Sequence, residues 1–233
     1  MMRMSFGGPA MGAWLATAVT LLLVGGALAT ATGATPASAA PADTVAPGAS
    51  SALGLSSTLG GVDVAEARAS YPEGPLRDAV DSVEVGAAAR ADAASGVALG
   101  ATAGVTGDDT TGETAARAGV AELTLRLGGG TLTTGPVSAD CSAGPGRAPT
   151  GAASLTDAGL ALPGHDPLTF DEAPAADTVV SLPDGLGRVV LNEWIAGADG
   201  SLTVNALRLE TTDGELTLGT VTCQGGGPVA EAA

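Results

Sequence analysis

Apolar and polar residues alternate most regularly in the C-terminal part of the chain. Four apolar-rich runs lie within residues 178–223, and each of the three turns between them contains an Asp-Gly pair, at Asp184, Asp199 and Asp213. Asp-Gly between two alternating runs is a strong short-range signal for an antiparallel hairpin. The pattern therefore predicts a four-stranded antiparallel meander over these residues.

A second hairpin is predicted upstream of the meander. Leucines alternate with polar residues over 121–127, and after a triple-glycine turn residues 131–141 run back as the partner strand. Pro136 has no backbone N–H for the ladder, so we expect the return strand to be an edge strand or to be bulged near Gly135. Side chains of a strand alternate between its two faces, so we expect Cys141 to point toward the core. The same face of this strand carries Val137 and Ala139.

The alanine-rich part of the chain gives a less regular pattern. Residues 62–71 and 83–92 both open Val-acid-Val and continue to an Arg-Ala pair, which suggests a repeated strand. For 83–92 the alanines favour a helix, whereas the opening valines, Gly86 and a period of two favour a strand. We expect one or two helical turns at residues 75–82 and a loop at 142–150.

Closely spaced strands with little helical sequence are typical of an all-β fold. We predict one antiparallel β-sandwich or open barrel over residues 52–224, between a flexible leader at 40–51 and a flexible C-terminal tail at 225–233. The aromatic residues beyond the N-terminal segment are few: Tyr71, Phe170 and Trp194. The core is therefore expected to consist of valine, leucine and alanine, which is a thin filling.

Residues 1–39 are predicted to be a cleaved secretory signal peptide. An apolar run spans 11–29, small residues follow it, and Ala39 completes an A-x-A cleavage site. The alternative is an uncleaved membrane anchor, but the densest apolar run, 14–24, is short for a bilayer span and no basic cluster follows. We expect a secreted or extracellular chain, associated at most with the cell envelope and without stable membrane insertion.

Charge narrows the range of partners. The chain carries 25 acidic residues against nine basic ones, all of them arginine, for a net charge of −16. Nucleic acids and anionic membranes bind basic surfaces, so neither is an expected partner. The expected partner is an unidentified component of the extracellular space or the cell envelope.

The chain has two cysteines, Cys141 and Cys223. Two cysteines in an exported chain favour one disulfide between them. In the chain-entropy model this bond would stabilise the fold by roughly 4–5 kcal/mol. A metal site is disfavoured, because two cysteines and a single histidine do not complete a tetrahedral shell.

No catalytic motif stands out in the sequence. His165 is the only histidine, and the adjacent Asp166 would point away from it on an extended chain, so we interpret His165 as a solvated turn residue. The carboxylate pairs available for glycoside hydrolysis are Asp108 with Asp109 and Asp171 with Glu172. Their turn-like surroundings favour solvated acidic turns. We therefore predict a non-enzymatic chain without a cofactor.

Two binding alternatives stay open beside a structural or adhesive role. The Asp-Gly turns of the meander offer oxygen ligands for Ca²⁺, although tight hairpin turns need the same pair. Trp194, next to Asn192 and Glu193, is usually a core filler in such a valine-rich strand, but it also suits ligand contact. The alternative function is a secreted module that binds Ca²⁺, a glycan or a small ligand.

Five segments share one further resemblance: Leu182-Pro183, residues 190–193, 202–207 and 219–223, and the cysteine segment 137–141. Together they resemble choice-of-anchor P family proteins, across residues 118–223 and more loosely across 53–102. The resemblance implies an exported, mostly actinobacterial β-domain of uncharacterised function, whose C-terminal attachment varies and which supplies no catalytic residues. The C-terminal residues show no recognisable anchor, so we expect release rather than wall attachment.

Overall fold

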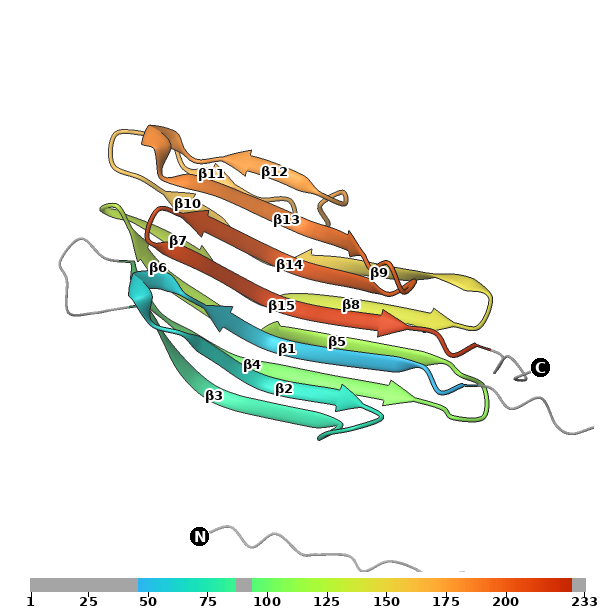
Figure 1. Cartoon of the computed structure of the whole chain (residues 1–233). Coiled ribbons are helices and arrows are strands. Elements are labelled where there is room, and N and C mark those ends of the chain that lie inside the picture. The colour runs from blue at the N-terminus through green and yellow to red at the C-terminus, as the bar shows by residue number, and fades with distance from the viewer. Residues whose placement is uncertain (1–45, 87–93, 228–233) are drawn as a thin grey trace, which may run out of the picture. The chain divides into compact units, whose positions relative to one another are not determined.

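The structure, a computed structural model, describes residues 46–86 and 94–227. These residues form two antiparallel β-sheets packed face to face, and within them only two short 3-10 segments are helical (Figure 1). The described residues contain no helix that is long and apolar enough to cross a membrane. The antiparallel all-β prediction is confirmed, in the form of a sandwich.

The six-stranded sheet consists of the predicted meander and the first two strands, in the order β12-β13-β14-β15-β1-β2. Its strands are β1 (Ala49–Ser57), β2 (Val64–Tyr71), β12 (Thr178–Ser181), β13 (Gly187–Ala196), β14 (Leu202–Thr211) and β15 (Gly214–Gln224), with 3-10 segments η1 (Leu59–Gly61) and η2 (Pro183–Gly185) in two connections. The meander and the strand over 62–71 are confirmed. Because β1 pairs with β15 from Ala49 onward, the predicted leader at 40–51 is wrong at its C-terminal end.

The nine-stranded sheet contains the central part of the chain, in the order β11-β10-β7-β6-β4-β5-β8-β9, with β3 on the other side of β4. Its strands are β3 (Arg77–Gly86), β4 (Ser95–Gly107), β5 (Thr114–Val120), β6 (Glu122–Leu127), β7 (Gly130–Thr134), β8 (Val137–Gly144), β9 (Arg147–Leu155), β10 (Gly159–Ala161) and β11 (Leu168–Thr169). The strand predicted over 121–127 is confirmed as β6, with its leucines buried.

The return strand of the second hairpin is interrupted near Gly135, as expected, but it is not an edge strand. Its second half, β8, lies between β5 and β9. Pro136 stands in the gap between β7 and β8, so no ladder hydrogen bond is lost. The inward positions of Val137, Ala139 and Cys141 are confirmed, since all three are buried.

Two expected non-strand segments are strands. Residues 77–82 belong to β3 instead of forming helical turns, because pairing with β4 outweighs a weak local helix preference. The loop predicted at 142–150 is reduced to a tight turn at Pro145 and Gly146, with Gly146 at φ 65°. The strand alternative for 83–92 is confirmed for 83–86, and the rest of that segment lies outside the described residues.

The last strand, β15, ends at Gln224. The first residues of the predicted flexible tail are nevertheless hydrogen-bonded to the body of the domain. Gly226 donates its N–H to the carbonyl of Gly112 at 2.8 Å, and Gly227 accepts from Ala46 at 2.6 Å. Residues 228–233 lie outside the described residues.

The inward-facing side reverses near the middle of the long strands β1, β4, β13, β14 and β15. In β4, for example, Ala98 is buried before Gly100, whereas Ala101 and Ala103 are buried after it. Positive φ angles mark this position in four strands: Ala67 (57°), Gly100 (60°), Asn192 (50°) and Gly219 (62°). In the six-stranded sheet the positions are cross-strand neighbours, in the row Asn192, Ala206, Gly219, Gly54 and Ala67. We call these positions, with Gly100, Ala121 and Pro136 in the other sheet, the reversal line.

The reversal line separates two unlike parts of the core. Among the residues that the structure describes, the twelve largest fully buried side chains are all leucines, and all except Leu155 lie on the side of the line that contains η1 and η2. We call that side the leucine half. Alanine is the most frequent buried residue on the other side, and we call that side the alanine half; its buried alanines are Ala52, Ala69, Ala101, Ala103, Ala116, Ala118, Ala139, Ala143 and Ala153.

Small residues let the sheets approach closely at the reversal line. A Cβ atom at Gly54 would stand 3.0 Å from the backbone nitrogen of Thr102, in the opposite sheet. A Cβ atom at Gly219 would stand 3.1 Å from the carbonyl oxygen of Ala118. The alanine and glycine content predicted to make a thin core therefore brings the two backbones almost into contact.

Candidate functional site

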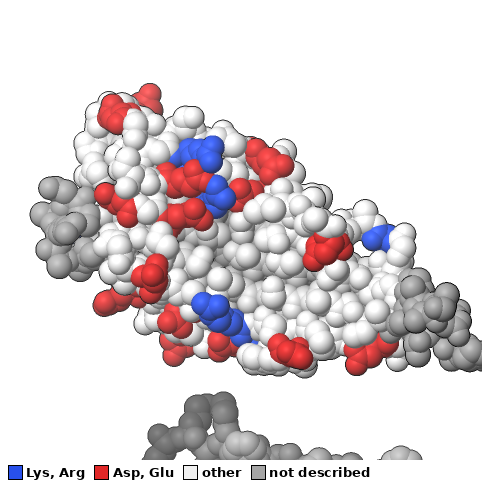
Figure 2. Space-filling model, in the orientation of Figure 1, with Lys and Arg blue, Asp and Glu red and all other residues white. Residues whose placement is uncertain are grey.

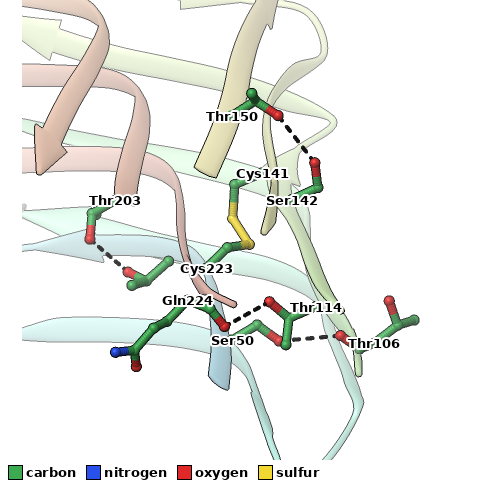
Figure 3. Close-up of a disulfide and its surroundings, with 10 residues drawn as sticks. Ser50, Thr106, Thr114, Cys141, Ser142, Thr150, Thr203, Cys223 and Gln224 are labelled. Atoms are coloured by element: carbon green, nitrogen blue, oxygen red, sulfur yellow. Dashed lines mark hydrogen bonds between the residues drawn. A yellow bond between two sulfur atoms is a disulfide. The ribbon is translucent and has the colours of Figure 1, made fainter. Parts of the chain in front are cut away.

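The two cysteines join the two sheets inside the alanine half. Cys141 of β8 and Cys223 of β15 form a disulfide, with their Cα atoms 6.0 Å apart, and both residues are buried. The predicted Cys141–Cys223 bond is therefore confirmed. Figure 3 shows the sulfur atoms bridging between the strands that carry them.

Short polar side chains hydrogen-bond around the disulfide (Figure 3). Thr114 donates to the carbonyl of Gln224 at 3.1 Å, and this bond also joins the two sheets. The hydroxyl groups of Thr203 and Thr222 lie 2.8 Å apart on the outer face of the six-stranded sheet. The disulfide thus stands in a region of small side chains and hydroxyl groups.

The three Asp-Gly turns do not form a common site. Asp184 and Asp213 lie in turns at the end of the meander that belongs to the leucine half, whereas Asp199 lies at the opposite end. Asp199 accepts hydrogen bonds from the Ser201 hydroxyl at 2.7 Å and the Ser201 N–H at 3.1 Å, and these bonds lower the pKa of its carboxyl. Among the described residues, no group of three or more His, Cys, Asp or Glu side chains is arranged to hold a metal ion.

The predicted carboxylate pairs have separate structural partners. Asp108 accepts backbone N–H groups of Thr110 at 2.7 Å and Thr111 at 3.2 Å, and these bonds lower the pKa of its carboxyl. Asp109 accepts the hydroxyl of Tyr71, and this hydrogen bond raises the pKa of Tyr71 to about 12. Glu172 accepts the Leu155 N–H through its backbone carbonyl at 2.8 Å. These contacts hold turns and connections in place.

His165 has a partner that local sequence did not reveal. Its Nε2 lies 2.9 Å from Oδ2 of Asp184, in η2, and not beside the adjacent Asp166. The two side chains are exposed by 37% and 74%, which matches the turn placement predicted for the histidine. The pair joins the β10–β11 connection to η2 at the surface.

The core-filler interpretation of Trp194 is wrong. Trp194 is 37% exposed, and the adjacent Ile195 is 46% exposed. The Trp194 indole N–H donates to Oδ1 of Asn192 at 2.9 Å, and Asn192 donates to the carbonyl of Pro174 at 2.9 Å. Trp194 is the cross-strand neighbour of the buried Val204, but β12 pairs only with residues 188–191 of β13, so the tryptophan lies on an edge segment of the sheet. A buried asparagine thus holds an exposed tryptophan.

Glu193, the third residue of that segment, belongs to a polar network on the outer face of β13, β14 and β15. Glu193 lies 3.1 Å from Arg208 and accepts a hydrogen bond from Asn205 at 2.8 Å. Arg208 also contacts Glu210, which pairs with Arg188 at 2.6 Å. Figure 2 shows the resulting mixture of basic and acidic side chains on this face. Sequence spacing alone did not reveal the network, because it depends on the register of three strands.

Comparison of the chain with protein-family models, with curated proteins and with solved structures found no match.

Proposed function

We propose that the chain is an exported, non-enzymatic β-sandwich domain with a structural or adhesive role in the extracellular space or at the cell envelope. The observation that carries the proposal is the buried disulfide between the two sheets. Disulfides form and persist in oxidising compartments, so a disulfide built into the core suits an exported domain. The signal-like N-terminus and the resemblance to choice-of-anchor P proteins support the same compartment.

Export is tested by expressing the full chain in a secreting actinobacterial host and analysing the medium by intact-mass spectrometry. We expect a mature chain that begins at Ala40 and contains no free thiol. A variant with Ala39→Leu keeps the apolar run and alters only the cleavage site, so we expect it to stay with the cells. A full-length wild-type chain in the cytosol with reduced cysteines would contradict the proposal.

A secreted ligand-binding module is the second candidate, and the exposed Trp194 is the observation that favours it. After removal of residues 1–39, Trp194 is the only tryptophan of the chain, so its fluorescence reports on this surface alone. Titration with Ca²⁺ and with neutral glycans should change the emission of the wild-type chain if either binds there. Unchanged emission at millimolar Ca²⁺ and glycan would remove this candidate at Trp194.

A further inference from the structure

Two shallow hollows adjoin on the outer face of the nine-stranded sheet, in the alanine half. One has a volume of 560 Å³ and the other of 470 Å³. They share Thr106, Ala115 and Ser142, so they form one continuous groove across β4, β5 and β8. Figure 1 shows these strands side by side. We call this groove, together with the adjoining Arg77 and Arg117, the arginine groove.

Two arginines stand on either side of a glycine in the floor of this groove. Arg77 of β3 is the cross-strand neighbour of Gly104 in β4, and Gly104 is the neighbour of Arg117 in β5. Neighbouring strands are about 4.8 Å apart, so the two arginine Cα atoms are separated by roughly 10 Å. The atom nearest to a Cβ at Gly104 would be Cγ of Arg77, at 3.9 Å. The space above Gly104 is therefore open.

Neither arginine forms an ion pair within the part of the chain that the structure describes, although Asp140 of β8 is the cross-strand neighbour of Arg117. The arginines with carboxylate partners there are Arg147, Arg188 and Arg208. Arg77 and Arg117 have no carboxylate within ion-pair distance among the described residues, although the chain carries 25 acidic residues. One acidic residue, Asp140, lines the 560 Å³ hollow beside the two arginines. This hollow thus has two arginines to one carboxylate, and the adjoining 470 Å³ hollow adds Asp108, Glu113 and Arg147.

Hydroxyl groups surround the arginine pair. Thr102 and Thr106 line the hollow from β4, and Ser142 lines it from β8, with its hydroxyl 3.2 Å from that of Thr150. Guanidinium groups bind carboxylates and phosphates through charge-assisted hydrogen bonds. Hydroxyl groups and a carboxylate such as Asp140 exchange hydrogen bonds with the hydroxyls of a sugar. The groove therefore combines the groups that recognise an anion with those that recognise a polyol.

We propose that the arginine groove binds an acidic saccharide, that is, a sugar unit bearing a carboxylate or phosphate group in an extracellular polymer. The acid group lies between Arg77 and Arg117, above Gly104, and the sugar hydroxyls extend toward Asp140 and Ser142. A nucleic acid is disfavoured because the rest of the surface is acidic. The choice of an extracellular polymer rests on the proposed export of the chain, whereas the anion site itself does not.

The binding test uses the exported chain and isothermal titration calorimetry at low salt. The probes are oligogalacturonate, which carries carboxylates, and poly(glycerol phosphate), which carries phosphates. Dextran serves as the uncharged saccharide and polyglutamate as the acidic polymer without sugar. We expect binding to one or both acidic polyols, weaker binding as salt is added, and no binding to dextran or polyglutamate. The polyol that binds identifies the acid group.

Three variants locate the site. Arg77→Gln combined with Arg117→Gln removes both guanidinium groups, and we expect about tenfold or greater loss of affinity. Gly104→Val fills the floor between them and should have a similar effect without changing charge. Arg126→Gln is the matched control, because Arg126 is exposed on β6 outside the groove and also has no carboxylate partner among the described residues. We expect less than a twofold change for it, and an unchanged melting temperature for all three proteins.

The proposal is overturned if neither acidic polyol binds the wild-type chain, or if polyglutamate binds equally well. It is also overturned if Arg126→Gln weakens binding as much as the double variant, since only general charge would then matter. An exported chain that fails to bind would refute the groove and leave the proposed compartment intact. A chain retained in the cytosol would refute export, while binding of the purified protein would still support the groove.

Discussion

The leucine half and the alanine half of the sandwich are stabilised in different ways. Each leucine side chain has three more carbon atoms than alanine, and burial contributes about 0.8 kcal/mol per methylene group. The half that contains eleven of the twelve largest fully buried leucines therefore gains most of the hydrophobic stabilisation. The alanine half has closely spaced backbones, hydrogen bonds between hydroxyls, and the only disulfide of the chain. The comparison shows that the disulfide lies in the half of the core that buries less apolar surface.

The largest effect is expected from removing the disulfide. Cys141→Ala combined with Cys223→Ala should lower the free energy of unfolding by roughly 4–5 kcal/mol, because the unfolded chain regains the entropy of a long loop. Urea denaturation followed by circular dichroism measures this change. A loss below about 1 kcal/mol would mean that the alanine half does not depend on the bond.

Large-to-small substitutions should separate the halves along a single strand. Leu218→Ala, in the leucine half of β15, is expected to cost about 2–5 kcal/mol through lost burial and a new cavity. Val221→Ala, across the reversal line on the same strand, removes fewer carbon atoms and should cost only about 1–2 kcal/mol. Equal losses by urea denaturation would contradict the division of the core.

Adding a single methyl group tests the close approach of the sheets. Gly54→Ala places a Cβ 3.0 Å from Thr102 and is expected to cost about 1–3 kcal/mol through overpacking. Gly104→Ala is the matched control, because its Cβ meets nothing nearer than 3.9 Å, and we expect a change below about 1 kcal/mol. If Gly54→Ala is as stable as the control, the two backbones are farther apart than described.

Sequence predicted the strands where alternation was regular and turns were explicit. The meander, the 121–127 strand and the cysteine pair followed from local pattern and cysteine number. Residues 75–82 were predicted incorrectly because pairing with β4 decides their conformation. Trp194 was misplaced because β12 pairs only with residues 188–191 of β13, so Trp194 lies on an edge segment although its neighbour in β14, Val204, is buried. A single positive φ in a strand leaves little trace in the sequence when the residue is not glycine.

The contacts at the candidate sites were even harder to predict from the sequence, because they depend on the register between strands. His165 meets Asp184, and Glu193 meets Arg208, through contacts between different elements. Arg77 and Arg117 come to the same groove because each is a cross-strand neighbour of Gly104. No spacing within one strand predicts such a row, since it requires the pairing of three strands.

The smallest effect concerns pH at the outer end of the alanine half. The hydrogen bond to Asp109 raises the pKa of Tyr71 from an ordinary value of 10.0 to about 12. The raised pKa means that this contact stabilises the fold fully below pH 10 and is lost as the pH rises toward 12. Ultraviolet absorbance of the single tyrosine should therefore titrate near 12, and Asp109→Asn should return it toward 10. A midpoint near 10 in the wild-type chain would show that the hydrogen bond is absent in solution.

Amide hydrogen exchange of the oxidised and the reduced chain, followed by mass spectrometry, tests the account most directly. Reduction of the disulfide should speed amide exchange in the alanine half, in peptides around Ala116, Ala139 and Val221. Peptides around Leu125, Leu207 and Leu218 should exchange as slowly as before. This result would show that the disulfide stabilises the half with fewer large buried side chains. Equal loss of protection in both halves, or earlier loss in the leucine half, would contradict the account.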